Sequence, residues 1–452
     1  MKLKNLLVIA LGLISSTLAF AQESEKVDTL NVLDQRLTTV EDAVFSLKKL
    51  KISGYIQAQW QSSQLDSALN KSNDMKSGTG IYGAEKAGVK DYNRFGVRRG
   101  RLKATYEDFG CQAVVEFDIS EGNGTTYLKT KDLYLNVLDP WINTVALKGG
   151  VFDRPFGYEV AYSSSKLESP ERSRIIQNLF PDEKDLGTML TIQAPKTSPW
   201  NVLKLEAGLL SGNSINKDYK SKKDLAAHLT YSNSTPILKY GIGVSMYAGS
   251  ILQTDTNVYV MKDGAFSRNI GTQPNKSTAR TYFGVDGQFS ISSDLGLSSI
   301  RAEYITGTQP GSAGSSASPN GFDPTAASFV AFPTYIRKFQ GGYINFVQDI
   351  ADTKHSIVVK YDWYDPNTAI KGASIGTMPA GLTGTNAKTG KADVAYSTLG
   401  LGYMYRMNNN VRLMVYYDMV SNEKVPTYSA SLKGFTKDLA DNLVTVRLQY
   451  KF

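Results

Sequence analysis

Residues 51–61 read KISGYIQAQWQ, and their alternating pattern is the clearest indication of the fold. Apolar or small side chains occupy every second position, and mostly polar ones fill the positions between. The first set is Ile52, Gly54, Ile56, Ala58 and Trp60, and the second is Tyr55, Gln57, Gln59 and Gln61. Such alternation over about ten residues is typical of a transmembrane β-strand with an apolar face toward lipid and a polar face toward a lumen.

The same alternation recurs along the chain and ends at its last residue. In the final stretch, Val444, Val446 and Leu448 alternate with Arg447 and Gln449. The predicted strands cover 51–61, 94–107, 110–120, 127–138, 143–153, 186–194, 201–211, 224–233, 237–249, 279–291, 296–307, 338–349, 353–364, 394–407, 410–421 and 441–452. The sequence therefore predicts an all-β protein, a sixteen-stranded antiparallel transmembrane β-barrel over residues 51–452.

The connections between these segments alternate in length. Tight ones follow the even-numbered segments, as at 108–110, 234–236 and 408–410, whereas most odd-numbered segments are followed by long ones. An up-and-down barrel with external loops and periplasmic turns requires this asymmetry. Trp60 and Trp363 fall at outer strand ends, and Trp141 and Trp200 fall in turns, which favours aromatic girdles at both membrane interfaces.

The first fifty residues follow other patterns. Lys2 and Lys4 precede an apolar run that ends in a small-x-small site at Ala21, so residues 1–21 are predicted to be a secretory signal peptide. Residues 22–50 carry a heptad seam made of Leu30, Leu33, Leu37, Val40, Val44 and Leu47. We expect a periplasmic helix that either self-associates as a short coiled coil or lies on the barrel mouth.

The composition argues against an enzyme. Cys111 is the one cysteine, and His228 and His355 are the two histidines, so thiol, triad and metal chemistry have few candidates. The sequence lacks H-E-x-x-H, G-x-S-x-G and phosphate-binding glycine loops. We expect no cofactor and no metal. The net charge of +8 is spread too evenly to predict nucleic-acid binding, and the chain is too short for a plugged 22-stranded transporter.

Specific motifs add a family resemblance. They are Arg98-Arg99-Gly100-Arg101-Leu102, Lys131-Asp132-Leu133-Tyr134-Leu135, Gly149-Gly150-Val151-Phe152-Asp153-Arg154-Pro155-Phe156-Gly157-Tyr158-Glu159, Ser163-Ser164-Ser165, Glu171-Arg172-Ser173 and Lys184-Asp185-Leu186-Gly187. In combination they resemble the phosphate-selective porins O and P. The resemblance covers nearly the whole mature chain, and it implies a sixteen-stranded outer-membrane barrel, a homotrimer, and passive diffusion of small anions such as phosphate or polyphosphate.

The resemblance also implies roles for two parts of the chain. The long connection over residues 154–185 would fold into the lumen as a constriction loop, which matters because sixteen strands leave an open aqueous channel. The terminal Phe452 resembles the aromatic residue that the barrel-assembly machinery recognises. Besides that machinery, the expected partners are outer-membrane lipid, further copies of the chain and small anionic solutes.

Basic residues near the loop are the candidate anion path. The candidates on or next to the wall are Arg99, Arg101, Lys103, Lys148 and Arg154, and those of the loop are Lys166, Arg172, Arg174 and Lys184. Arginine grips phosphate oxygens bidentately and a basic path attracts anions, but many such charges instead form cross-strand ion pairs. Arg172 and Arg174 could likewise pin the loop to acidic wall residues. A general pore for sugars or peptides, with Gln57, Gln59, Tyr106 and Tyr134 as possible sugar contacts, stays the alternative.

Overall fold

A computed structural model describes residues 36–41, 48–64, 92–122, 125–269, 276–319, 323, 325, 330–382, 384, 386–426 and 432–452. The chain divides into two units, Met1–Leu50 and Lys51–Phe452. The second unit is a β-barrel. None of the helices in the described ranges is long and apolar enough to cross a membrane.

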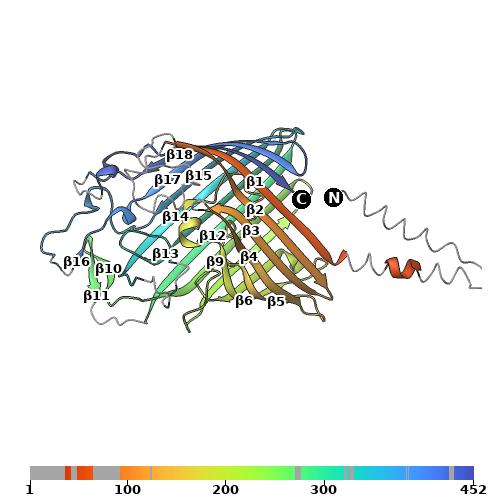
Figure 1. Cartoon of the computed structure of the whole chain (residues 1–452), viewed down its shortest axis with the longest axis horizontal. Coiled ribbons are helices and arrows are strands. Elements are labelled where there is room, and N and C mark those ends of the chain that lie inside the picture. The colour runs from red at the N-terminus through yellow and green to blue at the C-terminus, as the bar shows by residue number, and fades with distance from the viewer. Residues whose placement is uncertain are drawn as a thin grey trace, which may run out of the picture. The chain divides into compact units, whose positions relative to one another are not determined.

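Sixteen antiparallel strands close the barrel (Figure 1). They are β1 (Leu50–Ser63), β2 (Tyr92–Asp108), β3 (Cys111–Gly122), β4 (Thr125–Leu138), β5 (Val145–Asp153), β6 (Lys184–Gln193), β7 (Leu203–Leu210), β8 (Asp224–Ser234), β9 (Leu238–Leu252), β12 (Ser277–Ser293), β13 (Gly296–Gly311), β14 (Thr334–Asp349), β15 (His355–Asp365), β17 (Tyr396–Arg406), β18 (Val411–Asn422) and β19 (Leu443–Lys451). Each pairs with the next, and β1 pairs with β19, where Ile56 lies opposite Tyr450. The predicted fold and strand count are confirmed.

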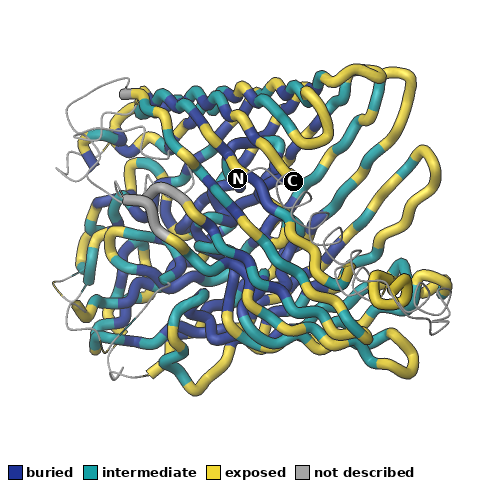
Figure 2. The backbone as a smooth tube through the Cα atoms, turned by 45° about the vertical axis from the view of Figure 1, so that its right-hand side comes forward, coloured by how far each residue is buried: buried dark blue, intermediate teal, exposed yellow. Residues whose placement is uncertain are grey.

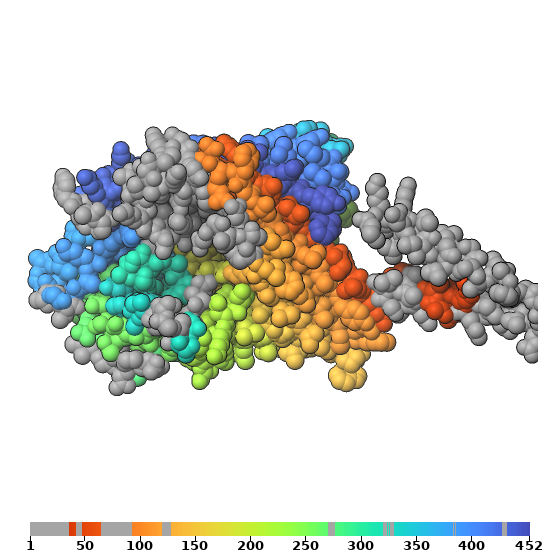
Figure 3. All heavy atoms as spheres, viewed as in Figure 1, coloured from red at the N-terminus to blue at the C-terminus, as the bar shows by residue number. Residues whose placement is uncertain are grey.

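Side chains alternate between the two faces of the wall, as the sequence predicts. In β1, Gln57, Gln59 and Gln61 are buried inside, whereas Ile52 and Ile56 are about half exposed outside. Figure 2 shows exposed and buried positions alternating along the strands, and in Figure 3 the strands β2 to β5 form one continuous outer face. This outer face is apolar because it meets lipid, which offers no hydrogen bonds.

The turn between β4 and β5 shows how the tight connections form. The Asp139 carboxylate accepts hydrogen bonds from the backbone N–H groups of Trp141, Ile142, Thr144 and Val145. These bonds favour the charged carboxylate, the ones from Val145 and Ile142 most strongly, and lower the pKa of Asp139 to about 2. Its neighbour Trp141 is exposed at this end of the barrel, as the girdle prediction requires. The turn between β6 and β7 contains a short 3-10 helix, η2 (Pro199–Val202).

The described parts of the later external connections pack together as a cap. They contain the short strands β10 (Val258–Lys262), β11 (Ala265–Asn269) and β16 (Asn386–Ala387) and the 3-10 helices η3 (Gly372–Ser374), η4 (Lys391–Asp393) and η5 (Lys433–Thr436). Strand β10 pairs in parallel with β14, and β11 pairs with β16. A small apolar core lies beneath them, made of Ile370, Ile375, Val394, Tyr396, Val420, Val425, Leu432 and Phe435. The buried pair Arg337–Asp393, at 2.8 Å, joins β14 to this cap.

The N-terminal predictions are largely outside the described residues. The signal peptide and most of the heptad seam fall there. Residues 36–41 are helical, and Leu37 and Val40 of the seam are more than half exposed. Whether this helix self-associates stays a prediction.

Candidate solute pathway

The connection between β5 and β6, residues 154–183, runs through the inside of the barrel. It contains a short α-helix of six residues, α3 (Arg174–Leu179). The Gln57 side chain of β1 donates to the Ser164 carbonyl at 3.1 Å, the Arg412 side chain of β18 donates to the Ser165 carbonyl at 3.2 Å, and Ser245 of β9 accepts from the Gly157 N–H at 2.8 Å. Because these strands lie around the wall, the loop crosses the lumen. The inward fold expected from the resemblance is confirmed.

The loop begins with a motif that fixes it to the wall. The Glu303 carboxylate of β13 accepts from the backbone N–H groups of Tyr158 at 3.3 Å and Glu159 at 3.1 Å. Gly157 has φ +58°, and a Cβ there would lie 1.8 Å from the Glu303 carboxylate. Only glycine fits this close approach. Glu159 in turn pairs with Lys360 of β15 at 2.8 Å.

One side of the loop packs against an apolar stretch of the wall. The cluster is Phe152, Phe156, Val160, Ile175, Ile176, Leu179, Phe180, Met189, Leu210, Ala226, Tyr247, Tyr282, Ile305, Phe339 and Tyr364. Phe156 and Phe180 are in ring contact at 4.9 Å, and Phe180 meets Tyr282 edge-on at 5.7 Å. Strands β6 to β15 supply most of the wall residues of this core. That side of the lumen is therefore filled with protein.

The other side of the loop meets charged wall residues, chiefly through its acids. Glu171 contacts Arg98 at 2.7 Å and Arg99 at 2.6 Å on β2, and Arg447 at 3.3 Å on β19. Burial disfavours the charged carboxylate, but the three guanidinium groups outweigh it and hold the pKa of Glu171 well below its usual range. Asp182 contacts Lys129 of β4 at 2.5 Å. Loop acids and wall bases thus hold this side together.

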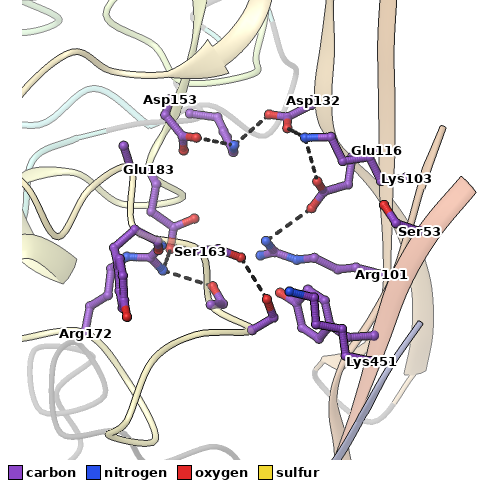
Figure 4. Close-up of a pocket in the computed structure, with 17 residues that line it drawn as sticks. Ser53, Arg101, Lys103, Glu116, Asp132, Asp153, Ser163, Arg172, Glu183 and Lys451 are labelled. Atoms are coloured by element: carbon purple, nitrogen blue, oxygen red, sulfur yellow. Dashed lines mark hydrogen bonds and ion pairs between the residues drawn. The ribbon is translucent and has the colours of Figure 1, made fainter. Parts of the chain in front are cut away.

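Two adjoining cavities lie between the loop and the wall of β2, β3 and β4. The one toward the periplasmic strand ends has a volume of about 270 Å³ and includes Ser53, Lys103 and Lys451 in its lining. The one toward the outer strand ends has a volume of about 300 Å³. Arg101, Arg172 and Glu183 line both cavities. Figure 4 shows Arg101 extending from the wall toward Glu183 and Arg172 of the loop across this space.

Two strand irregularities concentrate charge at these cavities. In β4 the register shifts so that Asp132 faces Glu116 and Thr130 faces Phe117, which leaves Lys131 as an extra residue. Lys131 and Asp132, adjacent in sequence, are both buried inside. Such a β-bulge re-aims a side chain that strict alternation would send outward.

Strand β2 shows the same effect. Arg98 and Arg99 are adjacent, yet both reach Glu171. Near the start of the strand the outward-facing residues have odd numbers, as Phe95 does. Further along they have even numbers, as Leu102 does. Period-two alternation in phase with Arg99 and Asp132 misses three basic lining residues, Arg98, Lys129 and Lys131. The sequence signal for Arg98 and Lys131 is a pair of adjacent charged residues inside an otherwise alternating strand.

Comparison with known proteins agrees with this architecture. The family model described as phosphate-selective porin O and P matches residues 71–317, more than half of the chain. The chain belongs to this family. It is an outer-membrane diffusion porin. A search of curated proteins finds no sequence match.

Solved porin structures resemble the barrel of this porin at low sequence identity. OprB of Pseudomonas putida, at high pH, matches with a TM-score of 0.53 and 10% identity over 90% of this chain and 94% of that one. Outer-membrane expressed OmpT of Vibrio cholerae matches with a TM-score of 0.47 and 11% identity over 89% and 97% of the two chains. At such identity the likeness concerns the fold.

Several of the basic residues predicted from the sequence line the porin's two cavities. Arg101 pairs with Glu116 at 3.3 Å and Asp118 at 3.2 Å. Lys103 contacts Asp132 at 3.0 Å, and Lys184 contacts the same carboxylate at 2.6 Å. Arg99, Arg101, Lys103, Arg172 and Lys184 all belong to the lining.

The remaining predicted residues lie elsewhere. Arg154 is buried against Asp185 at 3.0 Å. Lys148 stacks over the Tyr134 ring at 4.8 Å. Lys166 lines a third cavity at the periplasmic mouth, and the Arg174 guanidinium lies over the Tyr396 ring at 4.2 Å.

The prediction that Arg172 pins the loop to acidic wall residues was wrong. Its guanidinium contacts Glu183 of the same loop at 2.6 Å and donates to the carbonyls of Glu159 and Tyr162. The reason is that the loop folds back on itself, which brings its own Glu183 carboxylate into contact with Arg172. Burial opposes ionisation of Glu183, but Arg172, Lys131 and Arg101 hold its pKa well below the usual range.

The polar residues considered for sugar contacts have other roles. Gln57 and Gln59 are buried and bond to Arg99 and Arg447, beneath the loop. Tyr106 is exposed on the outer face with Leu102, and Lys148 lies over the Tyr134 ring. His228 is buried and contacts Asp286 at 2.8 Å. Within the described ranges, no group of three or more His, Cys, Asp or Glu side chains could hold a metal ion. The arrangement around the two cavities is a set of charged side chains, many of them in ion pairs.

Proposed function

We propose that this porin carries small anions, with inorganic phosphate as the first solute to test, through the two cavities beside β2 to β4. The supporting observation is their charge. The basic lining residues are nine, namely Arg98, Arg99, Arg101, Lys103, Lys129, Lys131, Arg172, Lys184 and Lys451, and the acidic ones are seven, namely Glu116, Asp118, Asp132, Asp153, Glu171, Asp182 and Glu183. Charged rings at the narrowest part of a pore set its selectivity, so we expect a modest preference for anions.

The third cavity strengthens the anion proposal. It lies at the periplasmic mouth, with a volume of about 550 Å³, and its charged lining is Lys166, Lys354, Arg406, Arg412, Lys451 and Glu168. Five bases against one acid create a positive vestibule next to the inner of the two cavities, with which it shares Tyr162, Ser165 and Lys451. A charged cleft with low-dielectric walls concentrates ions of the opposite sign.

Reconstitution in a planar lipid bilayer tests this function. We expect the reversal potential across a potassium chloride gradient to show anion preference, and added phosphate to reduce the chloride current. Cation preference in the same gradient would overturn the proposal. Exchange of Arg412 for glutamine should reduce the anion preference, because among the described residues the Arg412 side chain donates to neutral acceptors, such as Gln449 at 3.0 Å and the Ser165 carbonyl.

One observation favours a second candidate, a general diffusion pore for small hydrophilic solutes. The bases facing the two cavities are extensively paired, as Arg101 and Lys103 are with Glu116, Asp118 and Asp132. Paired charges attract a free anion less than unpaired ones do. A reversal potential near zero, with no effect of phosphate, would support this candidate instead.

We further propose that three copies assemble and that the terminal Phe452 is recognised during barrel assembly. Family membership supports both proposals. Bilayer insertion events should show three equal conductance steps, and chemical cross-linking should give a trimer. Phe452→Ala should lower the amount of porin that reaches the outer membrane, measured by immunoblot of membrane fractions, without changing the conductance of the protein refolded in vitro.

A further inference from the structure

The outer face of β12 has a glycine at the middle of its apolar band. The outward positions of this band are Phe283, Val285, Gly287, Phe289 and Ile291, of which all but the glycine have large, exposed side chains. Five alternate positions extend about 27 Å along a strand. With the usual tilt they span most of an apolar band about 25 Å tall. Gly287 therefore lies near the middle of the membrane.

The residues beside Gly287 turn this position into a recess. Directly opposite it are Ala302 of β13 and Ile242 of β9, and Ala302 is in turn opposite Ile344 of β14. Because opposite residues in antiparallel strands share a face, two small residues lie in a row between two exposed isoleucines. The recess has a volume of about 620 Å³, and its rim includes Phe289, Ile300, Tyr304 and Trp363.

The backbone does not require glycine in this recess. The described atom nearest to a Cβ added at Gly287 would be the Gly241 carbonyl oxygen, at 3.9 Å, which is an ordinary van der Waals distance. At Gly342, on the same outer face, a Cβ would lie 2.3 Å from a backbone oxygen and 3.1 Å from the Trp363 ring. Glycine within a strand costs stability, since its backbone loses more entropy and it has no side chain to pack. The fold therefore explains Gly342 but leaves Gly287 unexplained.

Two aromatic rings close the recess toward the outer strand ends. Tyr304 and Trp363 both lie opposite Gly342, one row nearer that end than the floor of the recess. The Tyr304 hydroxyl donates to the Gln340 side chain at 3.1 Å, and Trp363 is in ring contact with Tyr361 at 5.9 Å. Because both rings are held by these contacts, they do not move into the open space. A chain rising from the periplasmic leaflet would end against this closed edge.

The membrane has to supply whatever fills this space. Lipid covers the outer face of the barrel, and an unfilled space there would lose dispersion contacts on every side. Near the middle of the membrane the lipid offers hydrocarbon, namely the ends of acyl chains. A second copy of the porin is a poorer fit, because a stable protein contact covers about 800 Å² of each partner and this floor consists of Gly287 and Ala302.

We propose that the recess over Gly287 and Ala302 binds the end of one acyl chain of a periplasmic-leaflet phospholipid and holds it longer than the surrounding lipid is held. A chain in the recess meets protein beneath it and on both sides, whereas a chain on an even stretch of wall meets protein on one side. Each added contact is weak, but their sum is large. The site recognises the hydrocarbon chain, and the headgroup lies beyond it.

Electron paramagnetic resonance of the full-length porin in phosphatidylcholine vesicles tests this site. The probe is phosphatidylcholine with a spin label near the end of one acyl chain, whose spectrum separates motionally restricted chains from fluid ones. Gly287→Leu and Ala302→Leu should each remove about one restricted chain per protomer, because the new side chain takes the place of the lipid contacts. A label near the headgroup should show little difference. Equal restricted fractions in the wild type and both variants would overturn the proposal.

A matched control enlarges an alanine on the same strand outside the recess. Ala279 is exposed beyond Thr281, toward the outer end of β12, so Ala279→Leu should leave the number of restricted chains unchanged. Heat-modifiable mobility in gels shows which variants have a folded barrel, and folded variants are compared. If Gly287→Leu abolishes a cross-linked trimer of the wild type and leaves the restricted lipid unchanged, the recess faces another copy and the proposal is wrong.

Trp363 provides an independent measurement, because its side chain lines the recess. In a variant whose other tryptophans, Trp60, Trp141 and Trp200, are replaced by phenylalanine, phosphatidylcholine brominated near the chain end should quench the fluorescence of Trp363. Adding Gly287→Leu should reduce this quenching, whereas adding Ala279→Leu should not. Quenching that is the same with and without Gly287→Leu would contradict the proposed site.

Discussion

The two sides of the inward loop differ in what holds them to the wall. Toward β6 to β15 the contact is a core of aromatic and aliphatic side chains, with Phe156 and Phe180 at its centre. Toward β2 to β4 it is a set of ion pairs, of which Glu171 with its three arginines is the largest. The first contact is a core of buried apolar side chains, whereas the second borders both cavities. One loop thus blocks part of a wide barrel and shapes the passage that remains.

The two contacts differ in how much they stabilise the loop against the wall. Burying an aromatic or large aliphatic side chain contributes about 1.5 to 3 kcal/mol. A buried ion pair gains little overall, because removing two charges from water costs nearly as much as their attraction returns. The apolar side therefore supplies most of the stability of the loop, and the charged side supplies position and selectivity.

The largest expected effect comes from breaking the apolar side. Phe156→Ala removes a side chain that is 1% exposed, and such a change costs about 3 to 5 kcal/mol. The loop should loosen, so single-channel conductance should rise and the urea midpoint of unfolding should fall. Phe109→Ala, at a turn where the ring is 94% exposed, is the matched control. An unchanged conductance in folded Phe156→Ala would show that the core does not hold the loop.

A smaller change in stability, with a clear change in selectivity, is expected for Glu171→Gln. It leaves Arg98, Arg99 and Arg447 without their carboxylate, and breaking a buried pair in this way costs about 3 kcal/mol. The released positive charge should shift the reversal potential toward anions. Glu107→Gln, at the end of β2, is the control, and a shift toward cations would contradict the prediction.

The lowered pKa of Glu171 adds a pH dependence. The folded protein favours the charged carboxylate, so this contribution to stability is present above the unfolded pKa of about 4.3 and is lost as pH falls through the lower folded value. Wild-type selectivity should therefore stay constant from pH 7 to about pH 4.5. A change in reversal potential that titrates near pH 5 to 6 would implicate another group.

Asp441, between η5 and β19, is a buried acid that, unlike Glu171, forms no ion pair with any of the described residues. It is fully buried, its oxygens accept no hydrogen bond from another described residue, and burial raises its pKa to about 7 against the opposing attraction of Arg174. Its folded pKa is higher than its unfolded one, so stability is present at low pH and lost as pH rises through about 7. Asp441→Asn should raise stability at pH 8 by on the order of 1 to 3 kcal/mol and leave it unchanged at pH 4, measured by urea unfolding at both pH values.

The smallest effect is expected for Lys148→Gln. This lysine lies over the Tyr134 and Phe152 rings, at 4.8 and 5.7 Å, and is absent from the lining of the two cavities described above. We expect a loss of about 1 kcal/mol in stability and little change in the reversal potential. A clear loss of anion preference would indicate instead that Lys148 belongs to the anion pathway.

The barrel could be read from the sequence because its determinants are local. Alternation in stretches such as 51–61 and tight turns such as that at Asp139 are set by neighbours in the chain, and they gave the correct strand number. The charged residues of the pathway were harder to predict than the strands. Arg99, Arg101 and Lys103 follow from period two, but Lys131 depends on a bulge that places two adjacent residues on one face.

The sequence alone predicted that lipid would cover one face of the strands, because period-two apolar patterning combined with alternating long and tight connections is typical of a transmembrane barrel. It also determined that the lumen would be charged. Which charged side chains lie opposite one another depends on the tertiary structure and could not be predicted from the sequence. Glu171 meets Arg447, 276 residues away in sequence, because the closed barrel brings β2 and β19 to either side of β1. Long-range ion pairs of this kind depend on closure and on the path of one loop, and neither leaves a periodic signal in the chain.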